Sequence, residues 1–344
     1  MPGVVRSLCA LVALAVGVTA TAADPIRLRL DWTPWGNHAP FHLAQQRGLF
    51  AKHGLEVSID DGNGSVSTVQ IVGNGDYDVG HASLAPMAIA RSKGLPVTAI
   101  AGFVQQNDIG LLVPRSGPVR TVADLRGRSI VFTAGSLEAP FIDAFLASGK
   151  LKREDVNLIN VDAAAKTGMY MMGRADAALS SVPFFLAVVE PKRPSIAVKF
   201  ADAGLQFPSF GLFATDKTIA AKRDALRRFA SVSAGAWAFI FAGHEDAAVT
   251  AIMAARPQAK LDAKVLRQQI DTVREYAFTD AVRGLPFGTM ALTDWQQAVA
   301  TLAQGGLVDR AIAPGDLFTN DLIDPVLVRE AGAELGAGPG AETK

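Results

Sequence analysis

The fold of this 344-residue chain is decided near its start, by the stretch Ile26-Arg27-Leu28-Arg29-Leu30-Asp31-Trp32-Thr33-Pro34-Trp35-Gly36-Asn37-His38. Apolar and polar residues alternate from 26 to 30, which predicts a β-strand. A polar and aromatic turn follows at 31–38, and a helix is expected over 39–50. Strand, turn and helix in this order form the repeating unit of α/β proteins, in which ligands bind beyond the carboxyl ends of the strands.

The same unit recurs along the chain. A cluster rich in proline and glycine at 114–118 interrupts this alternation of strands and helices, which then resumes. A second break falls near Pro208, and the chain is mostly helical from 217 onward. We expect strands at 55–59, 78–82, 96–103, 129–132, 156–160, 175–180 and 210–215, and helices at 65–72, 85–93, 137–147 and 163–172. This order predicts mostly parallel sheets flanked by helices.

The two breaks indicate two lobes, because one unit inserted within another requires two chain crossovers. We place the crossovers near 114–118 and 208–216. Lobe I is then 24–114 with 214–330, lobe II is 118–209, and 331–344 is a flexible tail. Ligand would lie in the cleft between the lobes. The alternative is a single large α/β domain.

The N-terminus predicts an exported protein. Arg6, an apolar run at 8–18 and small residues at 20–23 are typical of a signal peptide, residues 1–23, cleaved after Ala22 or Ala23. The apolar run is shorter than the ~20 residues that span a bilayer, although an uncleaved anchor is the alternative. Cys9 is the only cysteine, so the core, not disulfides, must stabilise the mature chain.

Charge excludes two classes of partner. The chain has 33 basic and 33 acidic residues and no basic patch, so neither nucleic acid nor an anionic membrane is an expected partner. We expect a monomer that binds a small molecule.

The first turn carries the candidate ligand residues with the clearest chemistry: Asp31, Trp32, Trp35, Asn37 and His38. Tryptophan offers a flat apolar wall with one N–H donor, and asparagine and histidine both donate and accept hydrogen bonds. Such a set suits a planar ring with polar edges. The alternative is that the two tryptophans only plug the end of the sheet.

The other strand-to-helix turns supply further candidates, since parallel strands end at one edge. Glycine lets backbone approach a ligand and serine can cap the helix behind it. The expected ligand residues of these turns are Gly64, Ser65, His81, Ser83, Gln106, Asn107, Ser136, Glu138, Ser181 and Phe184.

Motifs for catalysis and metal binding are missing. The chain has no Gly-x-Ser-x-Gly elbow, and its cysteine lies in the leader. His38 and His42 have the spacing of a metal pair on a helix, but no glutamate follows His38 as in H-E-x-x-H. We therefore predict no catalytic residue, no metal site and no cofactor.

Several motifs resemble the NMT1/THI5-like (SsuA/THI5-like) group, which contains solute-binding proteins of ABC importers and thiamine-pyrimidine synthases. The matching stretches are 30–38, 44–50, 53–57, 73–80, 94–97 and 124–128, with looser matches at Gly288 and Trp295. The resemblance implies a two-lobed α/β fold of the type II periplasmic binding protein kind, with two crossovers at the hinge.

The synthase branch of this group carries a lysine, a histidine and a cysteine cluster. The corresponding positions here are Ala82, Pro86 and 208–212, and none has the required residue. A methyl group cannot replace a nucleophilic amine, so the resemblance favours a protein without enzymatic activity.

The importer branch implies a periplasmic binding subunit that delivers ligand to an ABC permease. Its thiamine-precursor binders carry a glutamate where this chain has Leu186, and Glu138 and Asp31 are the candidate substitutes. Arginines, which sulfonate or nitrate would favour, are missing from the turns. We therefore expect a small heteroaromatic ligand resembling a thiamine pyrimidine precursor. The alternatives are a nitrate, sulfonate or other solute binder, a sensor domain, or a synthase-like enzyme.

Overall fold

The computed structural model describes residues 22–308 and 312–337. The expected signal peptide therefore lies outside the described residues, apart from its last two positions. Within the described ranges, no helix is both long enough and apolar enough to cross a membrane.

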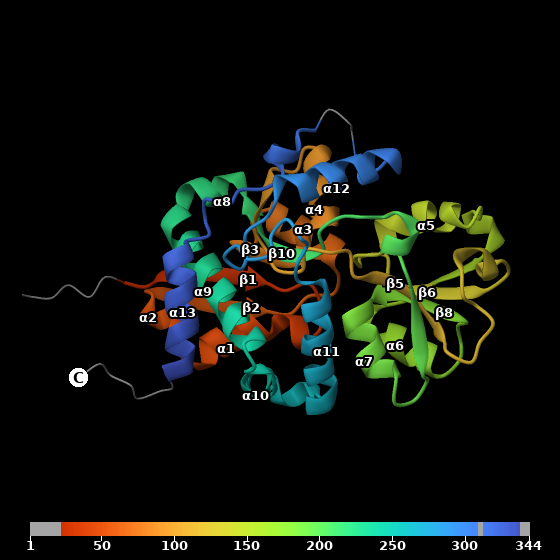
Figure 1. Cartoon of the computed structure of the whole chain (residues 1–344), viewed down its shortest axis with the longest axis horizontal. Helices are drawn as coiled ribbons and strands as arrows, with labels where there is room; N and C mark the ends of the chain where they lie inside the picture. The colour runs from red at the N-terminus through yellow and green to blue at the C-terminus, as the bar shows by residue number, and fades with distance from the viewer. Residues whose placement is uncertain (1–21, 309–311, 338–344) are drawn as a thin grey trace, which may run out of the picture.

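Two five-stranded sheets organise the molecule, one in each lobe (Figure 1). The first has the order β2-β1-β3-β10-β4 and the second β7-β6-β8-β5-β9. Their strands are β1 (Asp24–Arg29), β2 (Leu55–Asp60), β3 (Val79–Ser83), β4 (Val97–Gly102), β10 (Phe210–Thr215), and β5 (Ile109–Pro114), β6 (Ser129–Phe132), β7 (Asn157–Asn160), β8 (Ala177–Ser181), β9 (Ser195–Lys199). The predicted α/β fold with two lobes is confirmed.

Each sheet is mixed, because one of its five strands is antiparallel to the other four. β1 pairs in parallel with β2 and β3, whereas β10 is antiparallel to β3 and β4. In the second sheet β6 is parallel to β7 and β8, and β5 is antiparallel to β8 and β9. β5 and β10 are the strands that enter each sheet directly from the other lobe.

The first crossover lies earlier than expected. β4 ends the first run of lobe I at Gly102, and β5 begins at Ile109 in the second sheet. The chain therefore crosses at 103–108, and the predicted linker at 114–118 is a turn within lobe II. Proline and glycine mark both kinds of turn, so their presence could not tell a crossover from a connection between strands of one lobe.

The helices of the α/β units flank their sheets. They are α1 (Ala39–Gln46), α2 (Leu49–Lys52), α3 (Ser65–Gly73) and α4 (Leu84–Ser92) in lobe I, and α5 (Ile142–Ser148), α6 (Ala163–Met171) and α7 (Val182–Val189) in lobe II. The single helix expected over 39–50 is two helices, because Gly48 adopts a φ of +66°, in the left-handed region that glycine tolerates and that stops a helix.

The C-terminal part packs helices onto lobe I: α8 (Asp216–Ala221), α9 (Arg223–Phe241), α10 (Glu245–Ala255), α11 (Ala263–Tyr276), α12 (Leu292–Gln304) and α13 (Pro325–Ala337). The expected flexible tail is wrong for 331–337, which continue α13. Ala331 and Leu335 are buried, and the Cα of Gly235 in α9 lets α13 approach closely. The remainder of the expected tail, 338–344, lies outside the described residues.

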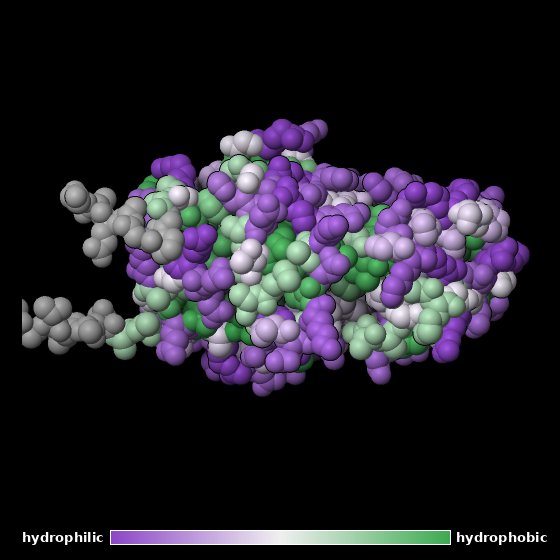
Figure 2. Space-filling view, turned by 90° about the horizontal axis from the view of Figure 1, so that it is seen from below, coloured by the Kyte–Doolittle hydropathy of each residue, from purple (hydrophilic) through white to green (hydrophobic). Residues whose placement is uncertain are grey.

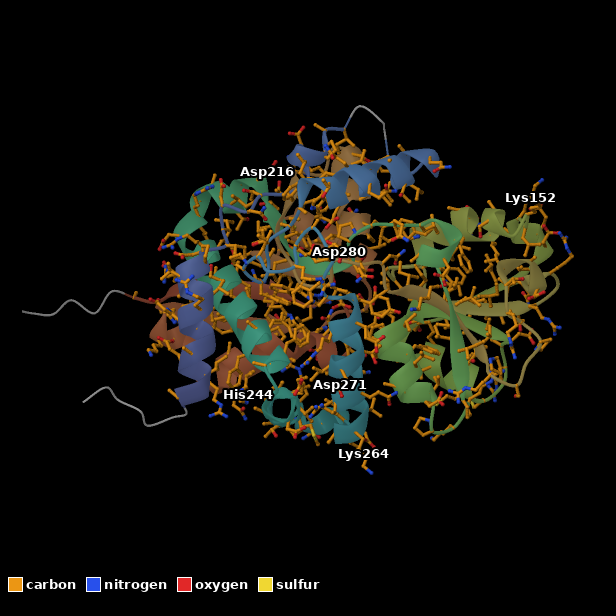
Figure 3. All side chains as sticks on the ribbon, in the orientation of Figure 1. Lys152, Asp216, His244, Lys264, Asp271 and Asp280 are labelled. Atoms are coloured by element: carbon orange, nitrogen blue, oxygen red, sulfur yellow. The ribbon has the colours of Figure 1, made fainter. Side chains whose placement is uncertain are left out.

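Apolar side chains fill the space between helices and sheets. Every residue of β3 is buried, as expected for a central strand covered on both faces. Hydrophilic residues cover most of the face seen in Figure 2. Charged residues such as Lys152 and Lys264 project from the periphery of the molecule (Figure 3), away from the contact between lobes.

Candidate functional site

A small cavity lies between the two lobes. The predicted residues that line it are Asp31, Trp32, Trp35, Ser65, Ser136, Ser181 and Phe184. Leu137, Ser180 and Phe210 complete the lining. Residues from both sheets therefore meet around one space, as a site that closes around a ligand requires.

Aromatic rings make up much of the cavity wall. The Trp35 ring contacts Phe184 of lobe II edge-on with centroids 5.6 Å apart, and it contacts Phe210 at 5.5 Å. The Trp32 centroid is 6.2 Å from that of Phe184. Phe210 was not among the predicted residues. It begins β10, so it reaches the cavity from a strand that sequence reading placed correctly but did not associate with the cleft.

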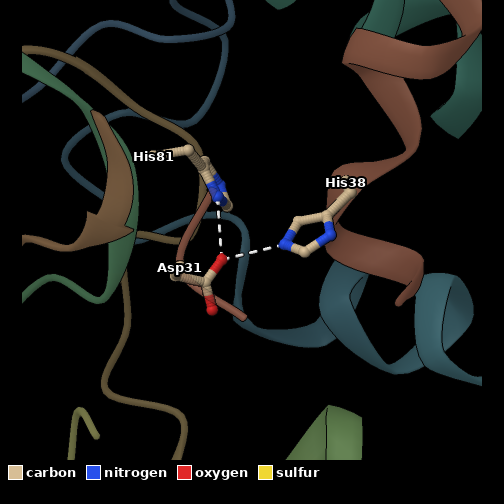
Figure 4. A group of neighbouring side chains, drawn as sticks. All are labelled: Asp31, His38 and His81. Carbon is tan, nitrogen blue, oxygen red and sulfur yellow. Dashed lines mark hydrogen bonds and ion pairs between the residues drawn. The ribbon is translucent and has the colours of Figure 1, made fainter. Parts of the chain in front are cut away.

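Asp31 is the buried carboxylate of the cavity, and two histidines hold it (Figure 4). Its Oδ1 lies 2.9 Å from Nε2 of His38 and 3.1 Å from Nδ1 of His81. Burial would raise the pKa of Asp31, but the hydrogen bonds from both imidazoles lower it to about 2. Burial lowers the pKa of His81. The carboxylate is therefore ionised, and both histidines donate to it.

The same three residues are close enough to hold a metal ion. However, the outer nitrogens, Nδ1 of His38 and Nε2 of His81, have no partner among the described residues. A histidine that binds metal ordinarily donates its second N–H to an acceptor. Hydrogen bonds between imidazole and carboxylate account for the contacts that the cluster makes.

Asn37, His38, His81 and Ser83 lie behind the cavity and do not line it. Of the ten buried side-chain polar atoms without a partner in the described part of the chain, eight belong to these residues, Trp35 and His42. Burial lowers the pKa of His42 to about 3, so its imidazole is neutral. This uncommon concentration of unpaired groups surrounds the turn that sequence analysis singled out.

Glu138 belongs to a buried ion pair in lobe II. Its Oε1 lies 2.9 Å from Nζ of Lys166, and its Oε2 accepts a hydrogen bond from the Ser136 hydroxyl. Lys166 also lies 4.9 Å from the Trp32 ring centroid, so its charge faces a cavity wall. Lys166 was missed, because a lysine on a predicted helix ordinarily points into solvent.

Gly64 lies where the lobes touch. Its φ is +150°, and a Cβ there would stand 2.0 Å from the carbonyl oxygen of Gly135 in lobe II. That same oxygen accepts hydrogen bonds from the N–H groups of Val66 and Ser67, in the first turn of α3. The neighbouring Ser65 hydroxyl accepts a bond from the Ser83 N–H at 3.1 Å.

Gln106 and Asn107 lie in the first crossover and not in the cavity. The Gln106 side chain donates to the Phe278 carbonyl, and the Asn107 side chain donates to the Leu205 carbonyl near the second crossover. Asp108 follows, with its carboxylate accepting bonds from the hydroxyls of Ser181 and Ser209. Burial raises the pKa of Asp108 to about 6, against the effect of these two bonds. These hydrogen bonds thus join the first crossover to the segment before the second crossover.

Gln269 of α11 links the cavity walls of both lobes. Its Oε1 accepts from the Gly36 N–H at 2.9 Å, and its Nε2 donates to the Phe184 carbonyl at 3.1 Å. In Figure 1, α11 lies beside α7, and the two helices are in contact. Sequence analysis missed Gln269, since α11 is more than two hundred residues away from the turn that it supports.

The comparisons with known proteins identify the family. A sequence model described as NMT1/THI5 like matches residues 35–247, so the chain belongs to this family. The formylaminopyrimidine-binding protein of Halalkalibacterium halodurans is 21% identical over 332 residues, covering 92% of this chain and 98% of that protein.

Two further proteins, one a relative in sequence and one similar in structure, differ in their activity. The 4-amino-5-hydroxymethyl-2-methylpyrimidine phosphate synthase THI11 of Saccharomyces cerevisiae is 27% identical over 139 residues, which span 40% of this chain and 41% of the enzyme. The alkanesulfonate-binding protein SsuA of Xanthomonas axonopodis is 16% identical with a TM-score of 0.65, covering 87% of this chain and 99% of that one, and so shows the shared fold.

Proposed function

We propose that this protein is a solute-binding protein of an ABC importer and captures a small heteroaromatic ligand between its lobes. The observation that carries the proposal is the inter-lobe cavity, whose wall combines Trp32, Trp35 and Phe184 with the ionised Asp31. Flat apolar walls suit a ring, and one fixed charge suits a polar edge of that ring. A ligand that contacts both lobes favours closure through its differential affinity for the closed state.

The relatives support this ligand class without naming the ligand. A relative that aligns along nearly its whole length is a formylaminopyrimidine-binding protein. The expected glutamate at position 186 is a leucine, so any pyrimidine would need another partner. We therefore propose a nitrogen heteroaromatic resembling a thiamine pyrimidine precursor.

A nitrate or sulfonate ligand is the second candidate, because an alkanesulfonate-binding protein shares the fold of this chain. The cavity argues for the heteroaromatic. Helix N-termini attract anions, but the N–H groups of Val66 and Ser67 at α3 already bind the Gly135 carbonyl. Lys166, the lysine beside Trp32, is paired with Glu138, and the cavity lining contains no arginine.

A synthase-like activity is the candidate from a different class, since the yeast relative is an enzyme. Ala82 lies buried in β3 and Pro86 in α4, where that branch carries its lysine and histidine. Incubation with pyridoxal phosphate should give no aldimine absorbance band, and a band would contradict the binding-protein proposal.

We further propose that the protein acts in the periplasm, after loss of residues 1–23, as a monomer that docks on an ABC permease. The test of the ligand class is a thermal-shift panel of aminopyrimidines, aromatic acids, alkanesulfonates and nitrate. A ligand at about a hundred times its Kd adds ~2.7 kcal/mol, which shifts the melting temperature visibly. A shift with aminopyrimidines alone is the expected result, and a shift with sulfonates or nitrate alone would contradict it.

A further inference from the structure

The two carboxylate oxygens of Asp31 differ in the number of hydrogen bonds that they accept. Oδ1 receives both histidine bonds, whereas no described residue donates a hydrogen bond to Oδ2. Figure 4 shows Oδ2 pointing away from both imidazoles. Asp31 also lines the cavity although the residue is only 3% exposed. An ionised carboxylate offers about four acceptor positions, so those of Oδ2 have no donor among the described residues.

The other buried carboxylate beside the cavity, Glu138, has a hydrogen-bond partner at each of its oxygens. Glu138 binds the Lys166 ammonium and the Ser136 hydroxyl, and its Oε1 also lies 3.5 Å from the Thr133 N–H. This pairing neutralises the nearby charge of lobe II. Among the described residues, Asp31 forms ion pairs only with His38 and His81, and no lysine or arginine pairs with it. The other titratable groups around this cluster are His42, whose lowered pKa keeps it neutral, and Asp108, whose raised pKa is partly caused by the Asp31 charge.

We propose that Oδ2 of Asp31 is the specificity-determining acceptor of the ligand, and that the ligand presents an N–H edge to it, as an amino-substituted or amidine-like nitrogen heterocycle does. His38 and His81 are then positioning residues, which fix the carboxylate through Oδ1 and keep it ionised. This inference rests on the proposed function and adds the chemical group that the ligand must carry.

The N–H edge follows from the cost of burying polar groups. A buried carboxylate oxygen that has no donor has lost its hydration, and a ligand that replaces the lost water must donate hydrogen bonds to it. An anionic ligand would instead place like charges together in a poorly hydrated space. The flanking rings of Trp32 and Trp35 add contact area for a planar molecule but do not distinguish a donor edge from an apolar one.

Two probes of equal size test the acceptor: 4-aminopyrimidine, which has the N–H edge, and 4-methylpyrimidine, which lacks it. Isothermal titration at about pH 7.5 should show tighter binding of the amino probe by about 10- to 100-fold, the range for a bond to a charged group. Asp31→Asn should abolish this preference. Asp61→Asn, on the same lobe but outside the cavity, should retain it.

The outcomes separate this inference from the proposed function. If the native protein binds both probes equally, or if Asp31→Asn retains the preference, the assignment of Asp31 is overturned while the protein remains a heteroaromatic binder. If neither probe nor any heteroaromatic of the thermal-shift panel binds, the proposed function fails, and this inference fails with it.

The positioning role has its own readout, a pH profile measured with benzamidine, whose charge is constant across the range. The native affinity should hold down to about pH 4, because Asp31 stays ionised. His38→Leu and His81→Leu should each move the loss of affinity to higher pH, since each variant removes one of the two hydrogen bonds that oppose the effect of burial on the carboxyl pKa. His38→Gln and His81→Asn keep an N–H near the original donor and should restore the native profile. Leucine variants with the native profile would contradict the positioning role.

Discussion

At the residue scale, side chains that are neighbours in sequence have different structural roles. Trp32 and Trp35 line the cavity, whereas Asn37 and His38 lie behind it and His38 supports Asp31. The sequence indicated a polar and aromatic turn at the end of a strand. It could not show which side chains of that turn line the cavity, because Gly36–His38 form a short helix whose residues are all buried and are not part of the cavity wall. The long-range support from Gln269 left no local signal.

Gly64 gives a prediction at this scale. Gly64→Ala should weaken binding of 4-aminopyrimidine by roughly tenfold or more, because its Cβ would clash with the Gly135 carbonyl and hold the lobes apart. Gly75→Ala is the matched control, since Gly75 also has a positive φ but has nothing within 4 Å of a Cβ. Titration calorimetry with both variants measures the difference. Equal affinities would show that the Gly64 contact does not form in the bound state.

At the element scale, the sequence located most strands and helices but misjudged what connects them. Alternation at 26–30 and 55–59 correctly indicated β1 and β2, because each strand has a buried and an exposed face. The crossover was misplaced, since 103–108 contains no proline or glycine to mark it. Gln106 and Asn107 were instead interpreted as ligand residues. Their partners Phe278 and Leu205 lie far along the chain and could not be foreseen.

The hinge carboxylate predicts a pH dependence. Asp108 has a pKa of about 6 in the folded chain against an ordinary value of 3.8. Its protonated form therefore stabilises the fold below about pH 4, and this contribution of about 3 kcal/mol is lost as the pH rises through 6. Asp108→Asn should become more stable relative to the native protein between about pH 4.5 and pH 7.5.

Urea unfolding at both pH values measures the effect, with Asp143→Asn as the control. Asp143 pairs with Arg153 on the surface, so its replacement should shift stability little and equally at both values. A difference between Asp108→Asn and the native protein that does not change with pH would contradict the assignment.

The helix α13 predicts a stability effect in a segment that composition alone assigned to a flexible tail. Leu335→Ala should destabilise the protein by about 2–5 kcal/mol, because it removes a buried side chain from the core cluster. Val326→Ala, on the exposed side of the same helix, should change stability by less than about 0.5 kcal/mol. Thermal melts of the two variants decide this, and equal melting temperatures would contradict the packing of α13.

At the scale of the whole molecule, two sheets joined by two crossovers define one cavity between lobes. Length and the repeated α/β unit predicted this architecture, since the second unit restarts the pattern of the first. Three connections shape the contact between lobes: the hinge at Asp108, the backbone contact of Gly64 with Gly135, and the bridge made by Gln269. Each joins residues that are far apart in the sequence, so none could be predicted from the sequence alone.

Capture of a heteroaromatic ligand between closing lobes is tested most directly by calorimetric titration of the native protein with 4-aminopyrimidine and, separately, with ethanesulfonate. We predict saturable binding of 4-aminopyrimidine at one site, with a negative heat-capacity change because apolar surface on both lobes is buried. We predict no binding of the sulfonate. Saturable binding of ethanesulfonate, with no heat from 4-aminopyrimidine, would contradict capture of a heteroaromatic ligand at Asp31 and the two tryptophans.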